Sequence, residues 1–268
     1  MARESKTPAL SLVMPCYNEA DCLRQTAGEL LRAFAQEQIP LQLVLVENGS
    51  LDGTGAIIDE LIAEGHPVTK VLVPVNQGYG HGVLEGLRRC EAPMVGMLCA
   101  DGQVSAEEAV ATYKQARAAS LPTLAKVRRR FRKDSWRRKV VSVIYNSVMQ
   151  ISFGWLGSID LNGSPKVMPR DVYEAMDLKS KDWFLDPEIM IKAKYLGVRV
   201  FEHDAEGLSR RGGKSNVRYA TILNFLLNIA RYRAGGELRE WKKSARRAAW
   251  MQRAASAAPP GAEGRKRA

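Results

Sequence analysis

The chain has 268 residues, of which 46% are hydrophobic, and its formal net charge is +11. This length suits one large α/β domain with a modest appendage, and the hydrophobic content excludes a globally disordered chain. The four cysteines form no CxxC pair, so a zinc or redox motif is not expected. No apolar run reaches the roughly 18 residues that a membrane-spanning helix needs. Reduced thiols are the default for such cysteines, so we expect a cytoplasmic protein, either free or bound peripherally to the inner face of the membrane.

Basic residues gather in two stretches. Residues 128–139 hold eight Lys or Arg and one acid, and residues 231–268 hold eleven Lys or Arg and three acids. Such clustering indicates a polyanionic partner, which can be phosphate, anionic lipid or nucleic acid. Nucleic acid is the least favoured, because only Phe131 and Trp136 interleave the first stretch and nucleic-acid readers usually mix aromatic with basic side chains.

The first hundred residues alternate strand and helix patterns. Short apolar runs predict strands at 10–14, 41–46, 68–73 and 94–99, with Pro15 ending the first, and helices are expected at 21–36, 52–64 and 82–89. Strands and helices alternating at this spacing predict an α/β fold with a mostly parallel central sheet and helices on both faces. In such sheets ligands bind at the carboxyl ends of the strands.

The rest of the chain is less regular. Helices are expected at 106–119, 138–153, 187–196 and 217–232, and strands at 121–127 and 198–202. We expect a catalytic domain in residues 1–216, an amphipathic and basic helical region in 217–253, and a disordered tail in 254–268. Either core packing or binding to an anionic membrane surface explains the wide apolar face of the helix at 217–232.

Polar side chains follow the first two strands. Tyr17 could stack on a nucleobase or ribose and Glu19 could accept hydrogen bonds from ribose hydroxyls, although a plain turn into the next helix also explains this segment. Glu47 and Asn48 stand at the second strand tip, where acceptor side chains could read a base or ribose. The alternative there is a helix cap, supplied by Ser50 or Asp52.

The next two strand ends are rich in glycine. Three glycines within residues 78–82 would let the backbone approach an anionic ligand at a helix start. Asp101 ends a buried strand and precedes Gly102, which presents a carboxylate to a divalent ion, and Gln103 adds an amide oxygen. Mg²⁺ and Mn²⁺ take few such ligands from protein and the rest from phosphate and water. The alternative is that Asp101 or Ser105 caps the next helix.

Two later segments also carry charged groups. Asp186 and Glu188 flank Pro187 at a helix start, where they serve either as an N-cap and a favourable first-turn charge or as carboxylates available for chemistry. Residues 210–215 form a cationic loop, suited to phosphate or simply a solvated turn.

Together these segments resemble the family-2 glycosyltransferases, which are inverting enzymes with the nucleotide-diphospho-sugar transferase (GT-A) fold. The resemblance runs from about residue 10 to 217 and rests on segments that occur in the right order: 11–19, 46–54, 76–86, 100–103, 160–166, 184–188 and 210–215. Within the family, the segments are most similar to the polyprenyl-phosphate sugar synthases, of the dolichyl-phosphate mannose synthase type.

The resemblance implies a role for each segment. It implies that a nucleotide-sugar donor is bound by Pro15, Tyr17, Asn18, Glu19, Glu47, Asn48, Gly49, Asn76, Gly82, Ala100 and Asp101. It implies Mg²⁺ or Mn²⁺ at Asp101 and Gln103, and catalytic roles for Asp101, Asp186 and Arg210. With the basic stretch, it assigns a polyprenyl-phosphate acceptor to Arg128, Arg138, Ser142, Lys214 and Ser215.

Two positions depart from the family pattern. Cys99 replaces the usual first aspartate of an Asp-x-Asp motif, which weakens the metal site but keeps Asp101. Glu47 and Asn48 replace two usual aspartates, which can change the nucleotide preference. We therefore expect transfer from a GDP- or UDP-sugar to a polyprenyl phosphate. The alternatives are a hydroxyl acceptor, with Asp186 or Glu188 as base, and a catalytically inactive relative that only binds nucleotide-sugar.

Overall fold

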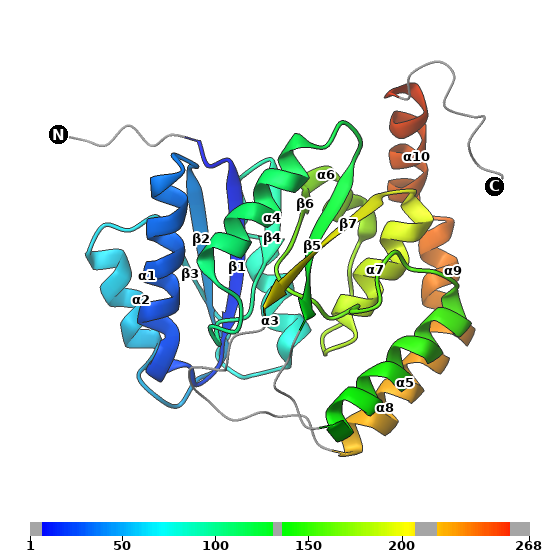
Figure 1. Cartoon of the computed structure of the whole chain (residues 1–268), viewed down its shortest axis with the longest axis horizontal. Coiled ribbons are helices and arrows are strands. Elements are labelled where there is room, and N and C mark those ends of the chain that lie inside the picture. Colours follow the sequence, from blue (N-terminus) through cyan, green and yellow to red (C-terminus); the bar gives the residue numbers. More distant parts are fainter. Residues whose placement is uncertain (1–6, 131–135, 207–218, 258–268) are drawn as a thin grey trace.

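The computed structural model describes residues 7–130, 136–206 and 219–257, without the side chains of 129–130, 136–142, 206, 219–226 and 257. Seven strands in these ranges form one sheet in the order β3-β2-β1-β4-β6-β5-β7 (Figure 1). Their bounds are β1 (Leu10–Cys16), β2 (Leu41–Glu47), β3 (Val68–Leu72), β4 (Met94–Met97), β5 (Thr123–Arg130), β6 (Lys166–Pro169) and β7 (Arg199–Glu206).

The sheet is mostly parallel, as predicted. Strands β1 to β4 run parallel, β5 and β7 are parallel to each other, and β6 is antiparallel to both β4 and β5. The register places Lys166 of β6 beside Met97 at the end of β4 and beside Lys126 of β5. Two lysines thus lie side by side next to the carboxyl end of β4.

Helices cover both faces of the sheet, which confirms the predicted layering (Figure 1). Along β1, Leu10, Leu12 and Met14 pack into one core while Val13 packs into the other, because successive strand side chains point to opposite faces. The first core includes residues of α1 (Ala20–Gln36), α2 (Thr54–Ala63) and α4 (Ala106–Ala118). The second includes residues of α3 (Tyr79–Leu87), α6 (Arg170–Met176) and α7 (Leu185–Leu196).

The remaining helices lie beyond the second face. Helices α5 (Trp136–Phe153) and α8 (Tyr219–Ala234) run side by side, followed by α9 (Gly236–Lys242) and α10 (Ala245–Ala257) (Figure 1). The buried indoles of Trp241 and Trp250 donate to the carbonyl oxygens of Ala175 (3.0 Å) and Leu196 (3.1 Å). The basic C-terminal region is therefore anchored on α6 and α7, and its helix continues to Ala257, past the expected start of the tail at residue 254. Residues 258–268 of that expected tail lie outside the described residues.

Some element boundaries differ from expectation. Strand β1 continues through Pro15 to Cys16, because β4 pairs only as far as Val13 and leaves the end of β1 with β2 as its single partner. Helix α3 begins at Tyr79, three residues earlier than expected, and the short helix α6 was not predicted, whereas α9 lies within the region 217–253 that was expected to be helical. None of the described helices is both long and apolar enough to cross a membrane.

Candidate active site

The loops that follow β1 and β2 are fastened to each other. Asn18 accepts a hydrogen bond from the Leu51 N–H (2.8 Å), and its own N–H donates to Ser50 Oγ (3.2 Å). Asp52 accepts from the N–H groups of Ala20 (3.1 Å) and Thr54 (2.9 Å). Partial burial opposes ionisation of Asp52, but a hydrogen bond from the Thr54 hydroxyl, together with these two N–H groups, outweighs it and lowers the pKa of Asp52. Asn18, predicted to bind the donor, therefore also holds the two loops together.

Tyr17 and Glu19 occupy the loop after β1. The Tyr17 side chain is 37% exposed, which leaves its ring available for stacking, whereas Glu19 is 8% exposed. The Cys22 Sγ lies 3.3 Å from the Glu19 carboxylate and 3.4 Å from the carbonyl oxygen of Ala100, so its single S–H can donate to either oxygen, and Cys22 connects this loop to the loop after β4. Burial, followed by the charge of Glu19 and then by Cys22 and Glu47, raises the pKa of the Cys16 thiol. The predicted donor residues of the first, second and fourth strand tips thus surround one small region.

Asn48 joins the loops after β2 and β3. Its Nδ2 donates to the carbonyl oxygen of Gly78 (3.3 Å), while Asn76 Oδ1 accepts from the Gly78 N–H (2.8 Å). A Cβ on Gly49, whose φ is +72°, would lie 2.7 Å from the Asn76 nitrogen. This loop therefore requires glycine at position 49. Glu47 is 8% exposed, and its Oε1 accepts from the Ser50 N–H (2.5 Å).

Asp101 and Gln103 share one tight turn. Gly102 has a φ of +66°, and Asp101 Oδ1 accepts from the Gln103 N–H (3.2 Å). The cap of α4 is Ser105, whose hydroxyl accepts from the Glu108 N–H (3.3 Å), so Asp101 is not needed as the helix cap. No cluster of three His, Cys, Asp or Glu side chains able to hold a metal occurs among the described residues. One carboxylate and one amide oxygen fit a Mg²⁺ or Mn²⁺ ion that takes its other ligands from diphosphate and water.

Two buried lysines lie next to this edge of the sheet, and the sequence interpretation missed both. Lys126 Nζ donates to Glu202 Oε1 (2.7 Å), to the carbonyl oxygen of Asp160 (2.7 Å) and to Ser158 Oγ (3.2 Å). Burial, together with the nearby charge of Lys166, lowers the pKa of Lys126 to about 8. A lysine within an apolar strand, here between Ala125 and Val127, is the sequence signal that predicts such a partnered buried charge.

The predicted catalytic residue Asp186 is the partner of the second lysine. Asp186 and Lys166 are 3% and 0% exposed and form an ion pair, and Lys166 also donates to the carbonyl oxygen of Gly163 (2.9 Å). Asp186 lies inside α7, which begins at Leu185 and has Phe184 at its N-cap position, so the expected capping role of Asp186 is not observed. Glu188 is fully buried and pairs with Lys192 (2.5 Å).

The structure describes part of the predicted acceptor site. Arg128, in β5, is paired with Asp204 and lies 4.0 Å from Glu202, both on β7. Arg138 and Ser142 lie in α5, but their side chains are outside the described part of the chain. Arg210, Lys214 and Ser215 lie outside the described residues.

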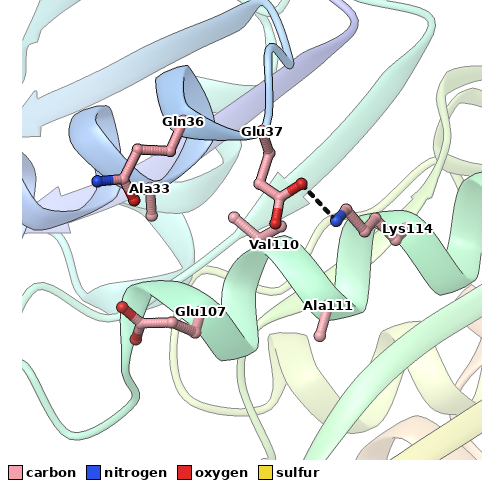
Figure 2. A pocket seen from close by; sticks show the side chains of 7 residues that line it. All are labelled: Ala33, Gln36, Glu37, Glu107, Val110, Ala111 and Lys114. Atoms are coloured by element: carbon pink, nitrogen blue, oxygen red, sulfur yellow. Dashed lines mark hydrogen bonds and ion pairs between the residues drawn. The ribbon is translucent and has the colours of Figure 1, made fainter.

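A surface pocket lies away from the predicted site residues. It lies between the end of α1 and α4, where Lys114 pairs with Glu37 (2.6 Å; Figure 2). Its lining residues are Ala33, Gln36, Glu37, Glu107, Val110, Ala111 and Lys114. Because none of the predicted site residues is among them, the strand-tip loops remain the candidate site.

Comparison with known sequences gives consistent matches. The model of the family described as glycosyl transferase family 2 matches residues 11–176. An undecaprenyl-phosphate 4-deoxy-4-formamido-L-arabinose transferase of Serratia proteamaculans is 30% identical over 231 residues, which cover 85% of this chain and 69% of the relative. A dolichyl-phosphate beta-glucosyltransferase of Trichomonas vaginalis is 25% identical over 221 residues, covering 78% and 68%. Among similar relatives the matched share of the relative's own length falls as low as 47%.

Solved structures share the fold at low identity. Glucosyl-3-phosphoglycerate synthase from Mycobacterium tuberculosis, solved with Mn²⁺, UDP and phosphoglyceric acid, has a TM-score of 0.67 and 14% identity, covering 85% of this chain and 79% of that one. Mannosyl-3-phosphoglycerate synthase from Rubrobacter xylanophilus has a TM-score of 0.64 and 16% identity, covering 87% and 75%. These likenesses confirm the predicted GT-A fold.

Proposed function

The chain belongs to glycosyl transferase family 2, and we propose that it moves a sugar from a GDP- or UDP-sugar to a polyprenyl phosphate with inversion at the anomeric carbon. Relatives named for undecaprenyl-phosphate and dolichyl-phosphate transfer support the choice of acceptor.

Donor binding is proposed at the strand-tip loops. Asn48 is 3% exposed, and its Oδ1 has no hydrogen-bond partner among the described residues, so it is available to accept from a nucleobase N–H. Tyr17 can stack on the base or ribose. Asp101 and Gln103 would hold the divalent ion, which when bound neutralises charge on the leaving nucleoside diphosphate.

The choice between acceptor classes rests on one observation. Asp186 and Glu188, the base candidates for a hydroxyl acceptor, are both buried in ion pairs with lysines. A polyprenyl phosphate needs no strong base, because its oxygen is already ionised near neutral pH. In the proposed step a phosphate oxygen bonds to the anomeric carbon while the bond from that carbon to the nucleoside diphosphate breaks.

Cationic side chains would hold the acceptor phosphate. We propose Arg128, Arg138 and Arg210 for this role, with the Ser142 hydroxyl as a further donor, together with Lys214 and Ser215, which follow Arg210 in the sequence. Because Arg128 is already paired with Asp204, it would have to share its guanidinium between that carboxylate and the phosphate. Arginine pairs with phosphate through two parallel hydrogen bonds, so lysine should substitute poorly.

A product assay tests the proposed function. Incubating the protein with Mg²⁺, a panel of UDP- and GDP-sugars and a short-chain polyprenyl phosphate should yield a lipid-linked sugar with at least one donor. Arg138→Ala should lower the yield, and the corresponding polyprenol, which lacks phosphate, serves as the control acceptor. Robust transfer to a sugar or alcohol, with no lipid-linked product from any donor, would refute the polyprenyl-phosphate acceptor but keep the transferase.

We also propose that the protein binds membranes peripherally through α5 and α8. Ile151 and Val143 of α5 are 85% and 65% exposed, and Leu227 of α8 is 42% exposed. Ile229 of α8 is buried, so the apolar face expected on α8 contributes in part to the core. We expect salt-sensitive flotation with liposomes that contain anionic lipid, weakened by Ile151→Asp and unchanged by Ile62→Asp on α2. Equal flotation with neutral and anionic liposomes, or none with either, would contradict this.

A further inference from the structure

Glu188 has no exposed surface, and both of its carboxylate oxygens are used. Oε1 accepts from Lys192 Nζ (2.5 Å), and Oε2 accepts from the Ser180 N–H (2.8 Å), while the Lys179 N–H lies 3.2 Å from each oxygen. Lys192, also fully buried, donates to the carbonyl oxygen of Asp177 (2.9 Å) and lies 5.3 Å from the centre of the Trp241 ring. The pair thus fastens the loop of residues 177–183 to α7 and to the C-terminal helix α9.

The fastened loop lies directly against the glycine-rich turn of the donor site, which is the first turn of α3 with its N-cap (residues 78–82). The His81 N–H donates to the carbonyl oxygen of Lys181 (2.9 Å). A Cβ on Gly78 would lie 2.6 Å from that same oxygen, and a Cβ on Gly80 would lie 2.4 Å from the carbonyl oxygen of Ser180. Such close approach between two backbones is possible only because glycine has no side chain. Movement of the loop would therefore move the turn.

The position of the glycine-rich turn fixes the orientation of the Asn48 side-chain amide. The Gly78 carbonyl oxygen can only accept hydrogen bonds, so it is the amide nitrogen of Asn48 that faces it (3.3 Å). Oδ1 then points away from Gly78, buried and without a hydrogen-bond partner among the described residues. A group that can donate to it, such as the ring N–H of uracil (N3) or guanine (N1), would complete the arrangement.

We propose that Glu188 and Lys192 form a positioning pair for nucleotide binding, acting through the 177–183 loop and the glycine-rich turn on the orientation of Asn48. This role rests on the proposed function, because it takes Asn48 to contact the nucleobase. In this role the buried Glu188 carboxylate positions the loop and transfers no proton. It also connects the site to Trp241, which lies beyond the region matched by the family model.

Nucleotide affinity in three variants tests the pair. Glu188→Gln and Lys192→Met should weaken binding of the preferred nucleoside diphosphate, UDP or GDP with Mg²⁺, by about tenfold or more and raise the donor KM in step, with little change in kcat. Lys192→Met is the milder change, since Glu188 keeps the N–H groups of Lys179 and Ser180 as donors. In both variants the loop keeps one further contact, the hydrogen bond from Asn228 to Asp182 (2.6 Å). Ile189→Ala, equally buried in the same helix, is the control for general destabilisation and should leave affinity unchanged.

Hydrogen exchange provides a readout without ligand. The His81 amide should exchange faster in Glu188→Gln and Lys192→Met than in the wild type, and Ile189→Ala should not reproduce this at a matched loss of Tm. Wild-type affinity and wild-type exchange in either folded variant would overturn the proposal, as would equal effects of Ile189→Ala. If the wild type binds no nucleoside diphosphate, the proposed function fails, and the exchange rates alone then decide whether the pair positions the turn.

Discussion

Replacing Asp101 by Ala should reduce kcat by roughly a hundredfold or more, the scale seen when a preorganised charge-stabilising group is removed from an active site. Asp101 supplies the single carboxylate of the proposed metal position, and Gln103 next to it is neutral. Without the carboxylate, Mg²⁺ or Mn²⁺ would be bound only by the diphosphate and by neutral groups. The negative charge on the leaving nucleoside diphosphate would then be less well neutralised.

Binding of Mn²⁺ separates this effect from misfolding. Electron paramagnetic resonance with UDP or GDP present should show weaker Mn²⁺ binding by Asp101→Ala, a smaller loss for Gln103→Ala, and tighter binding by Cys99→Asp, which restores the usual acidic residue. Retention of wild-type activity and metal dependence by Asp101→Ala would show that the metal lies elsewhere.

The sheet and the strand-tip positions were predictable from the sequence because both depend on local patterns. Short apolar runs such as 41–46 form strands, and glycine, asparagine and aspartate follow them, so parallel pairing brings Asn48 and Asp101 to one edge. The positive φ of Gly49 is likewise a property that only a few residue types accommodate. These features depend on neighbouring residues, which is why the sequence alone reveals them.

The pairing of buried charges was not predictable in the same way. Lys126 and Glu202 are 76 residues apart, and only the parallel alignment of β5 with β7 brings them together. The same alignment pairs Arg128 with Asp204, so a residue expected to bind the acceptor phosphate already has an anionic partner. The basic composition of the C-terminal region did not predict that α9 and α10 pack against α6 and α7. The indoles of Trp241 and Trp250 within that polar stretch were the sequence signal of burial.

Asp186→Ala should destabilise the protein by about 3–5 kcal/mol, because it leaves the ammonium group of Lys166 buried without its counterion. Lys166 has no exposed surface, and besides Asp186 it donates to the carbonyl oxygen of Gly163 (2.9 Å). Replacing both partners with apolar residues of similar size, as in Lys166→Met with Asp186→Leu, should recover much of the loss, since no uncompensated charge remains. Urea unfolding of the two single variants and the double variant measures the coupling between them.

Asp186→Asn distinguishes a structural role from that of a general base. The amide keeps the size of the side chain and an oxygen that can accept from Lys166, so the variant should unfold at a lower urea concentration yet stay folded in buffer. With a polyprenyl phosphate acceptor, its kcat should remain within about tenfold of wild type, because a phosphate oxygen needs no base, whereas loss of a general base typically costs about a hundredfold to ten-thousandfold. The conservative Asp186→Glu, which keeps the charge but lengthens the side chain in a filled site, serves as the comparison. A folded Asp186→Asn protein with wild-type stability and a kcat lowered by about a hundredfold to ten-thousandfold would identify Asp186 as the base. That result would favour a hydroxyl acceptor.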